Sequence, residues 1–407
     1  MMTQTTESPK LRFRADDGSE FPKWKSMPMR SLFSEVIEKK HPEYPVLSIR
    51  QGCGTILRDS SDRNIEYDKS NLTNYKVIEK GDFIIHLRSF EGGLECSALQ
   101  GISSPAYRIL RSDCIIPEAY KDYFRSHEFI NHRLSEAVVG IRDGKNIDMN
   151  IFWEIKVPYM ALPEQQKIAD FLSAYDKKIF LQKERVETLK EQKKGLLQKM
   201  FPKKGETVPE LRFPGFTGDW EQRKAIDIAD YSKGNGYSKG DLTDAGTPII
   251  LYGRLYTKYQ FAISEVDTFA VPRNGAVYSQ GNEVIVPASG ETAEDIARAS
   301  AVEKSGVLLG GDLNILRPFD FINPLFLALA ISNGEPQKEL AKKAQGKSVV
   351  HIHNTDIQEV TIAYPSRTEQ DRIVSVFRQL DNLITLHQRK LETMQEIKKG
   401  LLQQMFV

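Results

Sequence analysis

The chain is poor in cysteine, and its charges of opposite sign nearly cancel. Its 407 residues include only three cysteines, Cys53, Cys96 and Cys114. An odd number of cysteines without a C-x-x-C pair argues against a disulfide framework and against a cysteine-ligated zinc site. The 56 lysine and arginine residues face 55 aspartate and glutamate residues, which leaves a net charge of +1. The composition is therefore not that of a strongly basic nucleic-acid-binding protein.

Long hydrophobic runs are also missing. No apolar run approaches the roughly 20 residues that a helix needs to cross a bilayer. The N-terminal sequence MMTQTTESPKLRF lacks the apolar stretch of a signal peptide. We therefore expect a cytoplasmic protein without a membrane partner. At roughly 100–200 residues per domain, the length allows two or three domains.

An internal repeat organises the chain. The segment PEQQKIADFLSAYDKKIFLQKERVETLKEQKKGLLQKMF, from Pro163, matches TEQDRIVSVFRQLDNLITLHQRKLETMQEIKKGLLQQMF, from Thr368, without a gap at an offset of 205 residues. Shorter similarities relate LRF at Leu11 to LRF at Leu211, and the turn at Gly81 to the turn at Gly281. The chain therefore has the order A, helix, A′, helix.

The two A segments, roughly 14–160 and 214–363, are rich in Val, Ile, Tyr and Phe, interrupted by Gly, Pro, Asn and Asp. This pattern is typical of mixed α/β domains with many short strands. We place the boundaries of the four parts at 1–160 (with an ordered core from about 14), 161–202, 203–363 and 364–407.

Both helical segments carry an apolar seam with alternating steps of four and three residues, which is a heptad pattern. The seam residues are Ile168, Leu172, Ile179, Val186, Leu189 and Leu196 in the first helix, and Ile373, Phe377, Ile384, Leu391, Met394 and Leu401 in the second. Two equivalent seams are most simply buried against each other. If each helix relates to its own domain in the same way, the pair is antiparallel.

The predicted fold class is therefore α/β. Two mixed α/β domains in a pseudo-two-fold arrangement are separated by two long helices that form an antiparallel coiled coil. The first seam is roughly 48 Å long at about 1.5 Å per residue. Such a rod could space two DNA-reading domains by about one turn of DNA, or it could serve oligomerisation alone. The periodicity leaves both interpretations open.

Several motifs together resemble the specificity subunits of type I restriction–modification enzymes. They are ALPEQQKIADFLSAYDKKI followed by KKGLLQKMF, the linker VPELRFPGFTGDWEQRK, and the repetition of the helix at the C-terminal end. The resemblance covers essentially the whole chain. One departure is Thr368, which stands where the family has a proline, and we expect it to alter the start of the second helix slightly.

The resemblance implies that each globular part is a target recognition domain that reads one half of a bipartite, asymmetric DNA site. The helices would be spacers that set the gap and dock two modification subunits, which use S-adenosylmethionine to methylate adenine. Two restriction subunits that use ATP and magnesium would complete the complex, and DNA-mimic antirestriction proteins are a further class of partner. The resemblance assigns no catalytic residue, metal or cofactor to this chain.

Candidate DNA contacts are the loop residues with side chains that bind base edges or phosphates. In the first domain they are Arg50, Arg58, Arg88, Ser89, Arg142, Lys145 and Asn146. In the second domain they are Tyr252, Arg254, Tyr256, Lys258, Arg273, Tyr278, Ser289, Lys347, Ser348, His351 and Asn354. For each of them, a place in an ordinary surface loop is the alternative.

The alternatives are an autonomous DNA enzyme and a coiled-coil scaffold. An autonomous DNA methyltransferase or nuclease would need a site, but INPLF departs at Leu325 from the N-P-P-[YF] motif of adenine methyltransferases, and AKKAQGKS has Ala341 where a phosphate-binding loop has glycine. A coiled-coil scaffold with two protein-binding domains would need no site at all. A scaffold would lack the salt-dependent DNA affinity of a DNA reader.

Overall fold

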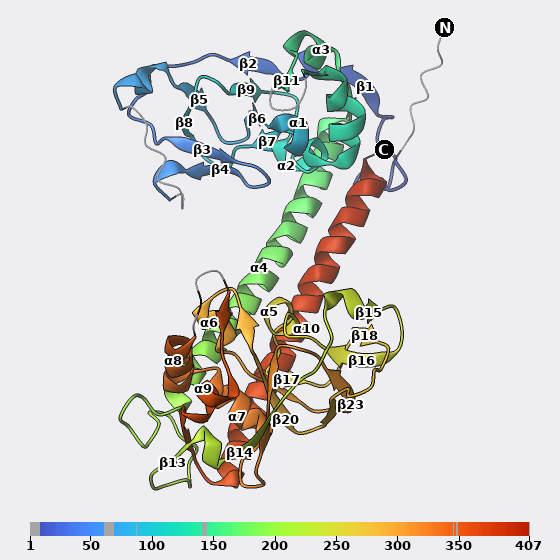
Figure 1. Cartoon of the computed structure of the whole chain (residues 1–407). Coiled ribbons are helices and arrows are strands. Elements are labelled where there is room, and N and C mark those ends of the chain that lie inside the picture. The colour runs from blue at the N-terminus through green and yellow to red at the C-terminus, as the bar shows by residue number, and fades with distance from the viewer. Residues whose placement is uncertain are drawn as a thin grey trace. The chain divides into compact units, whose positions relative to one another are not determined.

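The computed structural model describes residues 9–60, 69–86, 88–140, 145–344, 346 and 349–406. The chain divides into two compact units (Figure 1). Unit 1 comprises Met1–Lys183 and Arg389–Val407, and unit 2 comprises Glu184–Gln388. All three cysteines are free. Within the described ranges, no helix is both long enough and apolar enough to span a membrane.

Unit 1 combines short strands with short helical turns ahead of the long helix α4. Its strands are β1 (Lys25–Pro28), β2 (Ser34–Val36), β3 (Leu47–Arg50), β4 (Gly54–Leu57), β5 (Lys76–Ile78), β6 (Phe83–Ile85), β7 (Glu95–Cys96), β8 (Gly101–Ser103), β9 (Arg108–Arg111), β10 (Val138–Val139), β11 (Asn146–Ile147) and β12 (Lys156–Tyr159). Its α-helices are α1 (Ser89–Gly92), α2 (Pro117–Tyr120), α3 (Met149–Glu154) and the first part of α4 (Leu162–Met200). The remaining helical turns are η1 (Met29–Ser31), η2 (Arg58–Ser60), η3 (Lys69–Asn74), η4 (Tyr123–Arg125), η5 (Glu128–Arg133) and η6 (Leu134–Ala137).

Unit 2 repeats this plan with more strands. They are β13 (Glu221–Lys224), β14 (Ala229–Lys233), β15 (Leu242–Thr243), β16 (Thr247–Ile250), β17 (Ala262–Ile263), β18 (Phe269–Ala270), β19 (Tyr278–Gln280), β20 (Glu283–Pro287), β21 (Ser289–Gly290), β22 (Ser300–Val302), β23 (Ser305–Leu309), β24 (Leu313–Pro318), β25 (Val350–His351) and β26 (Thr361–Tyr364). The helices are η8 (Ala225–Asp227), η9 (Lys239–Asp241), α5 (Arg254–Thr257), α6 (Ala293–Ile296), α7 (Pro324–Ile331), α8 (Gly334–Lys343), α9 (Asn354–Gln358) and the first part of α10 (Arg367–Met405).

The main sheets of the two units have equivalent strand orders. In unit 1 the order is β2-β9-β6-β7, and in unit 2 it is β14-β24-β20-β22-β17. The turns at Gly81 and Gly281 open the equivalent strands β6 and β20, and both glycines have positive φ angles, 96° and 102°. Such backbone favours glycine. The short similarity between these two turns therefore corresponds to a shared structural position. Unit 2 adds a second sheet of order β15-β18-β16-β23-β19.

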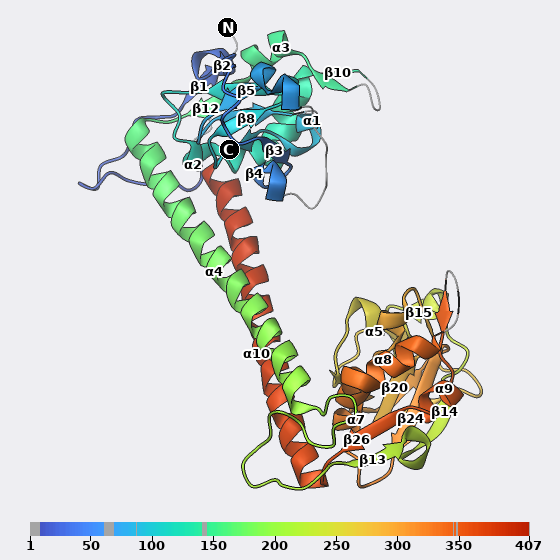
Figure 2. The ribbon, with the colours of Figure 1, turned by 90° about the vertical axis from the view of Figure 1, so that its left-hand side faces the viewer.

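Helix α7 lies against the main sheet of unit 2 (Figure 2) and is buried along most of its length. Asn323 is its N-cap and accepts hydrogen bonds from the amides of Leu325 and Phe326, while Pro324 takes the first helical position. Asparagine and proline favour these two places at a helix start. The Asn-Pro pair of the INPLF motif therefore has a structural role here.

The two long helices pack antiparallel within each unit, as predicted. In unit 1, Leu172 of α4 shares a hydrophobic core with Leu401 and Met405 of α10, and Asp176 Oδ1 lies 2.5 Å from Lys398 Nζ. Residue numbers therefore fall along α10 as they rise along α4. Every seam residue predicted above is buried or half-buried.

The same ion pair occurs in unit 2 with the helices exchanged. Lys193 Nζ of α4 lies 2.6 Å from Asp381 Oδ1 of α10. An offset of 205 residues converts Asp176 into Asp381 and Lys193 into Lys398. The internal repeat thus produces one interhelical contact twice, and each copy fixes the register of the pair in its own unit.

A buried carboxylate anchors the start of each long helix. In unit 1, Glu164 receives two hydrogen bonds from Arg12, at 2.9 and 2.7 Å, and one from Trp24 Nε1 at 2.9 Å. In unit 2, Glu369 receives the equivalent pair from Arg212, at 2.7 and 2.8 Å. Residues before position 14 therefore take part in unit 1.

The following glutamine is buried as well and ties each helix to its domain. Gln165 accepts from the Ile116 amide at 2.7 Å and donates to the carbonyls of Cys114 and Met160, at 3.0 and 2.9 Å. Gln370 does the same with Asn323, Phe321 and Pro365. Side-chain amides thus satisfy backbone groups that would otherwise be buried without partners.

We expected Thr368 to alter the start of the second helix, but the structure shows no such change. Helix α10 begins at Arg367, which is equivalent to the first residue of α4, Leu162. The amides of a first helical turn have no intrahelical partner with or without proline. The hydrogen bonds of Gln370 fix the helix start, so proline is not needed.

We predict that Gln165→Ala destabilises unit 1 by about 2–3 kcal/mol, because it leaves buried backbone groups without partners. The neighbouring Gln166 is exposed, and its side chain bonds Asp170 of the same helix. Gln166→Ala is therefore the matched control and should change stability by less than about 0.5 kcal/mol. Urea unfolding, followed by tryptophan fluorescence in a Trp220→Phe background, measures unit 1 alone. Equal stabilities of the two variants would contradict the prediction.

Candidate nucleic-acid interface

Three loops of unit 1 meet at the short helix α1, which follows strand β6. The side chain of Gln51, from the turn between β3 and β4, lies so close to Gly92 that a methyl group there would meet its Nε2 at 2.5 Å. From the loop that precedes β11, Lys145 Nζ lies 5.8 Å from the centroid of the ring of Phe90 in α1. Arg88 is the N-cap of α1. Loops that are far apart in the sequence therefore form one surface.

This surface, the α1 face, presents exposed cations and amides. Of the predicted contact residues, Arg88 and Lys145 belong to it, and Arg50 and Asn146 are their sequence neighbours; all four are exposed. Gln51 joins them and is also exposed. Arginine and lysine bind guanine edges and phosphates, and the side-chain amides bind adenine edges. The α1 face therefore has the chemistry of a surface that binds DNA.

The remaining predicted residues of unit 1 lie elsewhere. Ser89 is fully buried, and its Oγ accepts a hydrogen bond from the His86 amide at 2.8 Å. Its hydroxyl closes a turn. A DNA contact would have to face solvent, and this hydroxyl does not. Arg58 is half-buried in η2. Arg142 lies outside the described residues.

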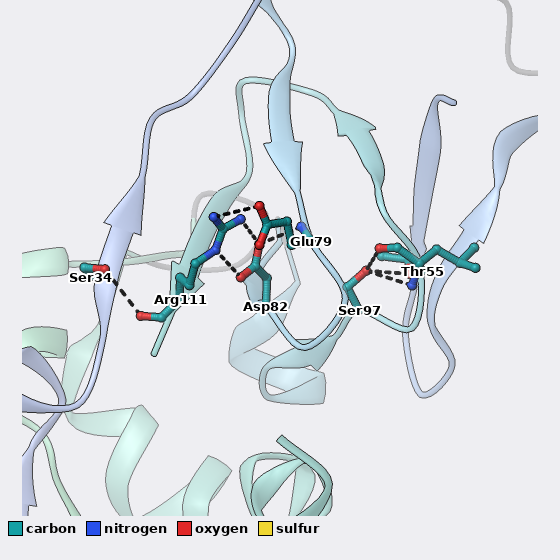
Figure 3. Close-up of polar contacts among 7 residues, drawn as sticks. Ser34, Thr55, Glu79, Asp82, Ser97 and Arg111 are labelled. Atoms are coloured by element: carbon teal, nitrogen blue, oxygen red, sulfur yellow. Dashed lines mark hydrogen bonds and ion pairs between the residues drawn. The ribbon is translucent and has the colours of Figure 1, made fainter. Parts of the chain in front are cut away.

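Strands of unit 1 are joined by polar contacts between their side chains (Figure 3). Thr55 Oγ1 of β4 lies 2.8 Å from Ser97 Oγ, which follows β7. Arg111 of β9 donates to both oxygens of Asp82, each at 2.8 Å. These hydrogen bonds raise the pKa of Arg111, whereas its partial burial opposes the change. Arg111 is thus engaged within the protein.

In unit 2, helix α5 and the strand pair β21–β25 bring predicted residues together. Tyr256 Oη donates to the Ser289 carbonyl, and Ser289 Oγ lies 3.1 Å from Nδ1 of the exposed His351. The ring of Tyr252 lies 6.2 Å from that of Tyr256 in an edge-on arrangement. Burial raises the pKa of Tyr256. This α5 cluster is aromatic and imidazole-bearing, unlike the α1 face.

Two cations of this cluster share one carboxylate. Arg254 Nη1 and Lys258 Nζ lie 2.6 and 2.5 Å from the two oxygens of Asp267. The hydrogen bonds from Lys258 and then Arg254 hold the pKa of Asp267 below its usual range. The side chain of Arg254 is only 9% exposed, whereas that of Lys258 is 54% exposed. Only Lys258 is therefore open to a phosphate.

The other predicted residues of unit 2 belong to different elements. Arg273 pairs with Asp241 and lies over the ring of Tyr237. Tyr278 is exposed on β19 of the second sheet. Asn354 donates to the Ser232 carbonyl at 2.9 Å. Lys347 and Ser348 lie outside the described residues.

Sequence reasoning missed Glu95 and Arg125, which lie beneath the α1 face. Glu95 is fully buried and forms an ion pair with Arg125. The signal available in the sequence was an acidic residue inside the apolar string GGLEC. If a carboxylate in such a string is buried with its apolar neighbours, it needs a charged or hydrogen-bonding partner.

Comparisons with known proteins agree with this architecture. Residues 29–191 and 217–396 match the family model described as the type I restriction modification DNA specificity domain. The type I restriction enzyme MjaVIII specificity subunit of Methanocaldococcus jannaschii is 22% identical over 268 residues. That alignment takes in 63% of this chain and 62% of the relative, which is less than two thirds of its length.

Two solved structures share the fold along nearly the whole chain. The S subunit of a type I restriction-modification system from M. genitalium has a TM-score of 0.58 at 13% identity, with 98% of this chain and 99% of that chain covered. A chain from a study of complex assembly and conformational transition of the type I R-M system has a TM-score of 0.55 at 18% identity, with 94% and 96% covered.

We predict that His86, at the edge of the α1 face, has a pKa below the usual value of about 6.5. Burial lowers its pKa, and the charge of Glu95 opposes this only partly. The Arg88 amide donates to its Nδ1 at 3.2 Å, which requires an unprotonated Nδ1. The unfolded chain therefore binds the proton more readily. The stability from neutral His86 is complete above about pH 6.5 and is lost as the pH falls towards the folded pKa.

NMR titration of the imidazole signals tests this, with assignment by His86→Gln. His41 is the control, since a hydrogen bond with Glu43 raises its pKa. We expect His86 to titrate below His41 and below the ordinary value. The opposite order would refute the assignment.

Proposed function

Since the chain belongs to the family of type I restriction modification DNA specificity domains, we propose that it recognises DNA sequence on behalf of a type I restriction–modification complex. The observation that carries the proposal is the double match of the family model, at residues 29–191 and 217–396. One match begins in each unit, and each unit has its own surface of polar loops.

In this proposal each unit reads one half of a bipartite DNA site. The asymmetry of the site follows from the difference between the two surfaces. The α1 face offers arginine, lysine and amide side chains, whereas the α5 cluster offers Tyr252, Lys258 and His351. Different donors and acceptors select different bases in the major groove. The two half-sites should therefore differ in sequence.

The helices α4 and α10 act in the proposal as spacers of fixed length. Each has 39 residues, which corresponds to roughly 58 Å at about 1.5 Å per residue. The Asp176–Lys398 and Lys193–Asp381 pairs hold one register. Such a spacer would set the number of unspecified base pairs and would offer its outer surface to two modification subunits.

The chemistry would belong to the partners. Modification subunits would bind S-adenosylmethionine and methylate adenine, and two restriction subunits would use ATP and magnesium. This chain would supply double-stranded DNA recognition and no catalytic group. DNA-mimic antirestriction proteins would compete for the same surfaces, because they present similar negative charge.

Base-resolution mapping of adenine methylation tests the proposal. The chain is expressed with a cognate modification subunit in a host that lacks other methyltransferases. We expect one split motif with a fixed gap, which disappears when the chain is omitted. Exchange of residues 214–363 for those of a relative should change one half of the motif and leave the other. If the modification subunit co-purifies but no split motif appears, the proposal fails.

The salt dependence of DNA binding separates a DNA reader from a protein scaffold. The logarithm of affinity should fall with the logarithm of salt concentration, by a slope of about 0.9 for each phosphate contacted. Lys258→Ala, which removes one exposed cation, should reduce the slope by about one contact. Lys338→Ala on α8 is the matched control, because Lys338 is also an exposed lysine in an ion pair but lies outside the α5 cluster. A scaffold would show no slope.

A further inference from the structure

The turn between β3 and β4 rests on a buried carboxylate. Glu95 of β7 is fully buried. Its two oxygens accept hydrogen bonds from the amides of Gly52 and Gly54, at 2.6 and 2.9 Å. Both flanks of the turn are thus bound from below by one side chain that lies more than 40 residues away in the sequence.

Arg125 completes the support. Its Nη2 pairs with Glu95, and its Nη1 points to the Gly52 carbonyl at 3.4 Å. Gly54 has a φ of +83°, and a methyl group there would meet the Cys96 carbonyl at 2.4 Å. Only glycine fits this position. Backbone donors and acceptors of the turn are therefore fixed by groups from two other elements.

The upper side of the turn is exposed. Gln51 and Cys53 are both exposed, and Arg50 precedes them. The side chain of Gln51 lies against Gly92, next to Lys145 and Arg88 on the α1 face. A glutamine amide can both accept from and donate to an adenine edge. The supported turn thus presents an exposed amide side chain beside cationic residues.

Stability alone does not explain this support. A surface turn can leave its amides to water, and a buried ion pair adds little net stability because both charges lose their hydration. What the Glu95–Arg125 pair adds is position, since it holds a short turn in one place. Contacts with base edges need side chains placed to within about 0.5 Å.

We propose that the turn Gln51–Cys53 is a base-contacting element of unit 1, with Gln51 as a specificity-determining residue and Glu95 and Arg125 as positioning residues. The proposal deepens the function proposed above and rests on it. The ligand is one half-site of double-stranded DNA, bound through its base edges.

Alkylation of the native Cys53 tests whether the turn meets DNA. The full chain with its modification subunits is treated with iodoacetamide, and each cysteine is followed by mass spectrometry. With the mapped duplex at about 100-fold above its Kd, alkylation of Cys53 should slow by more than about tenfold. Cys96 is the negative control and should stay unmodified with or without DNA, because burial raises its pKa to about 12. Unchanged alkylation of Cys53 on the bound specific duplex would overturn the proposal.

Gln51→Ala tests the specificity role. We expect discrimination at one or two base pairs of a single half-site to fall between about 5- and 150-fold, while the other half-site is read as before. Gln166→Ala, an exposed glutamine on α4, is the matched control and should leave the motif intact. An unchanged motif in Gln51→Ala would remove Gln51 from the proposal.

Glu95→Gln tests the positioning role, because it keeps the shape of the side chain and one acceptor oxygen but removes the charge that faces Arg125. We expect relaxed discrimination at the base pairs that Gln51→Ala affects, with circular dichroism unchanged. Equal weakening at both half-sites would indicate a structural role only and would contradict the assignment. If Glu95→Gln does not fold, the alkylation of Cys53 and the motif of Gln51→Ala decide whether the turn contacts DNA.

The failures of the two proposals are distinguishable. If the wild-type complex methylates no split motif, the proposed function fails before the turn is tested. If a split motif appears while Cys53 stays reactive on DNA and Gln51→Ala keeps the motif, only the role of the turn is rejected.

Discussion

The buried carboxylate at the start of each long helix is the interaction on which the rest of the structure depends. Glu164 and Glu369 are almost fully buried, and each is satisfied by the forked guanidinium of an arginine that precedes the first strand of its unit. Removing one member of such a pair leaves an uncompensated buried charge, which costs about 3–5 kcal/mol. Because the neighbouring glutamine binds three backbone groups of the adjoining domain, the helix cannot turn relative to that domain without breaking the network. A recognition surface on the domain therefore keeps a defined orientation to its helix.

The helices and their direction could be predicted because the information is local and repeated. Heptad spacing specifies a buried seam, and the gapless repeat implies that both helices relate to their domains in one way. The Lys–Asp pairs follow the same logic, since Asp176 and Lys193 have their equivalents in Asp381 and Lys398. The effect expected of Thr368 was wrong for a related reason. A local rule about proline was applied where the long-range hydrogen bonds of Gln370 fix the helix start.

The candidate interface could be predicted only at the level of loops. Polar loop residues such as Arg88 and Arg254 look alike in the sequence, but the first is exposed and the second is held by Asp267 and the Glu265 carbonyl. Ser89 has the composition of a DNA contact, yet its hydroxyl is used to close a turn. The support of the turn at Gln51 joins residues 41 and 43 positions apart. Such partners depend on tertiary packing, which residue types and spacing in one sequence do not encode.

The repeat itself separates the residues that build the fold from those that would bind DNA. Arg12, Glu164, Gln165 and Asp176 recur as Arg212, Glu369, Gln370 and Asp381, and all of them make contacts within the protein. The exposed Arg88 of the α1 face does not recur. At the offset of 200 residues that relates the two glycine turns, it corresponds to Ala288. A chain that folds one architecture twice and reads two different half-sites must keep the residues that build the fold and change those that bind DNA. Repetition is therefore a criterion for scaffold residues, and its absence at an exposed position such as Arg88 is the pattern that sequence recognition requires.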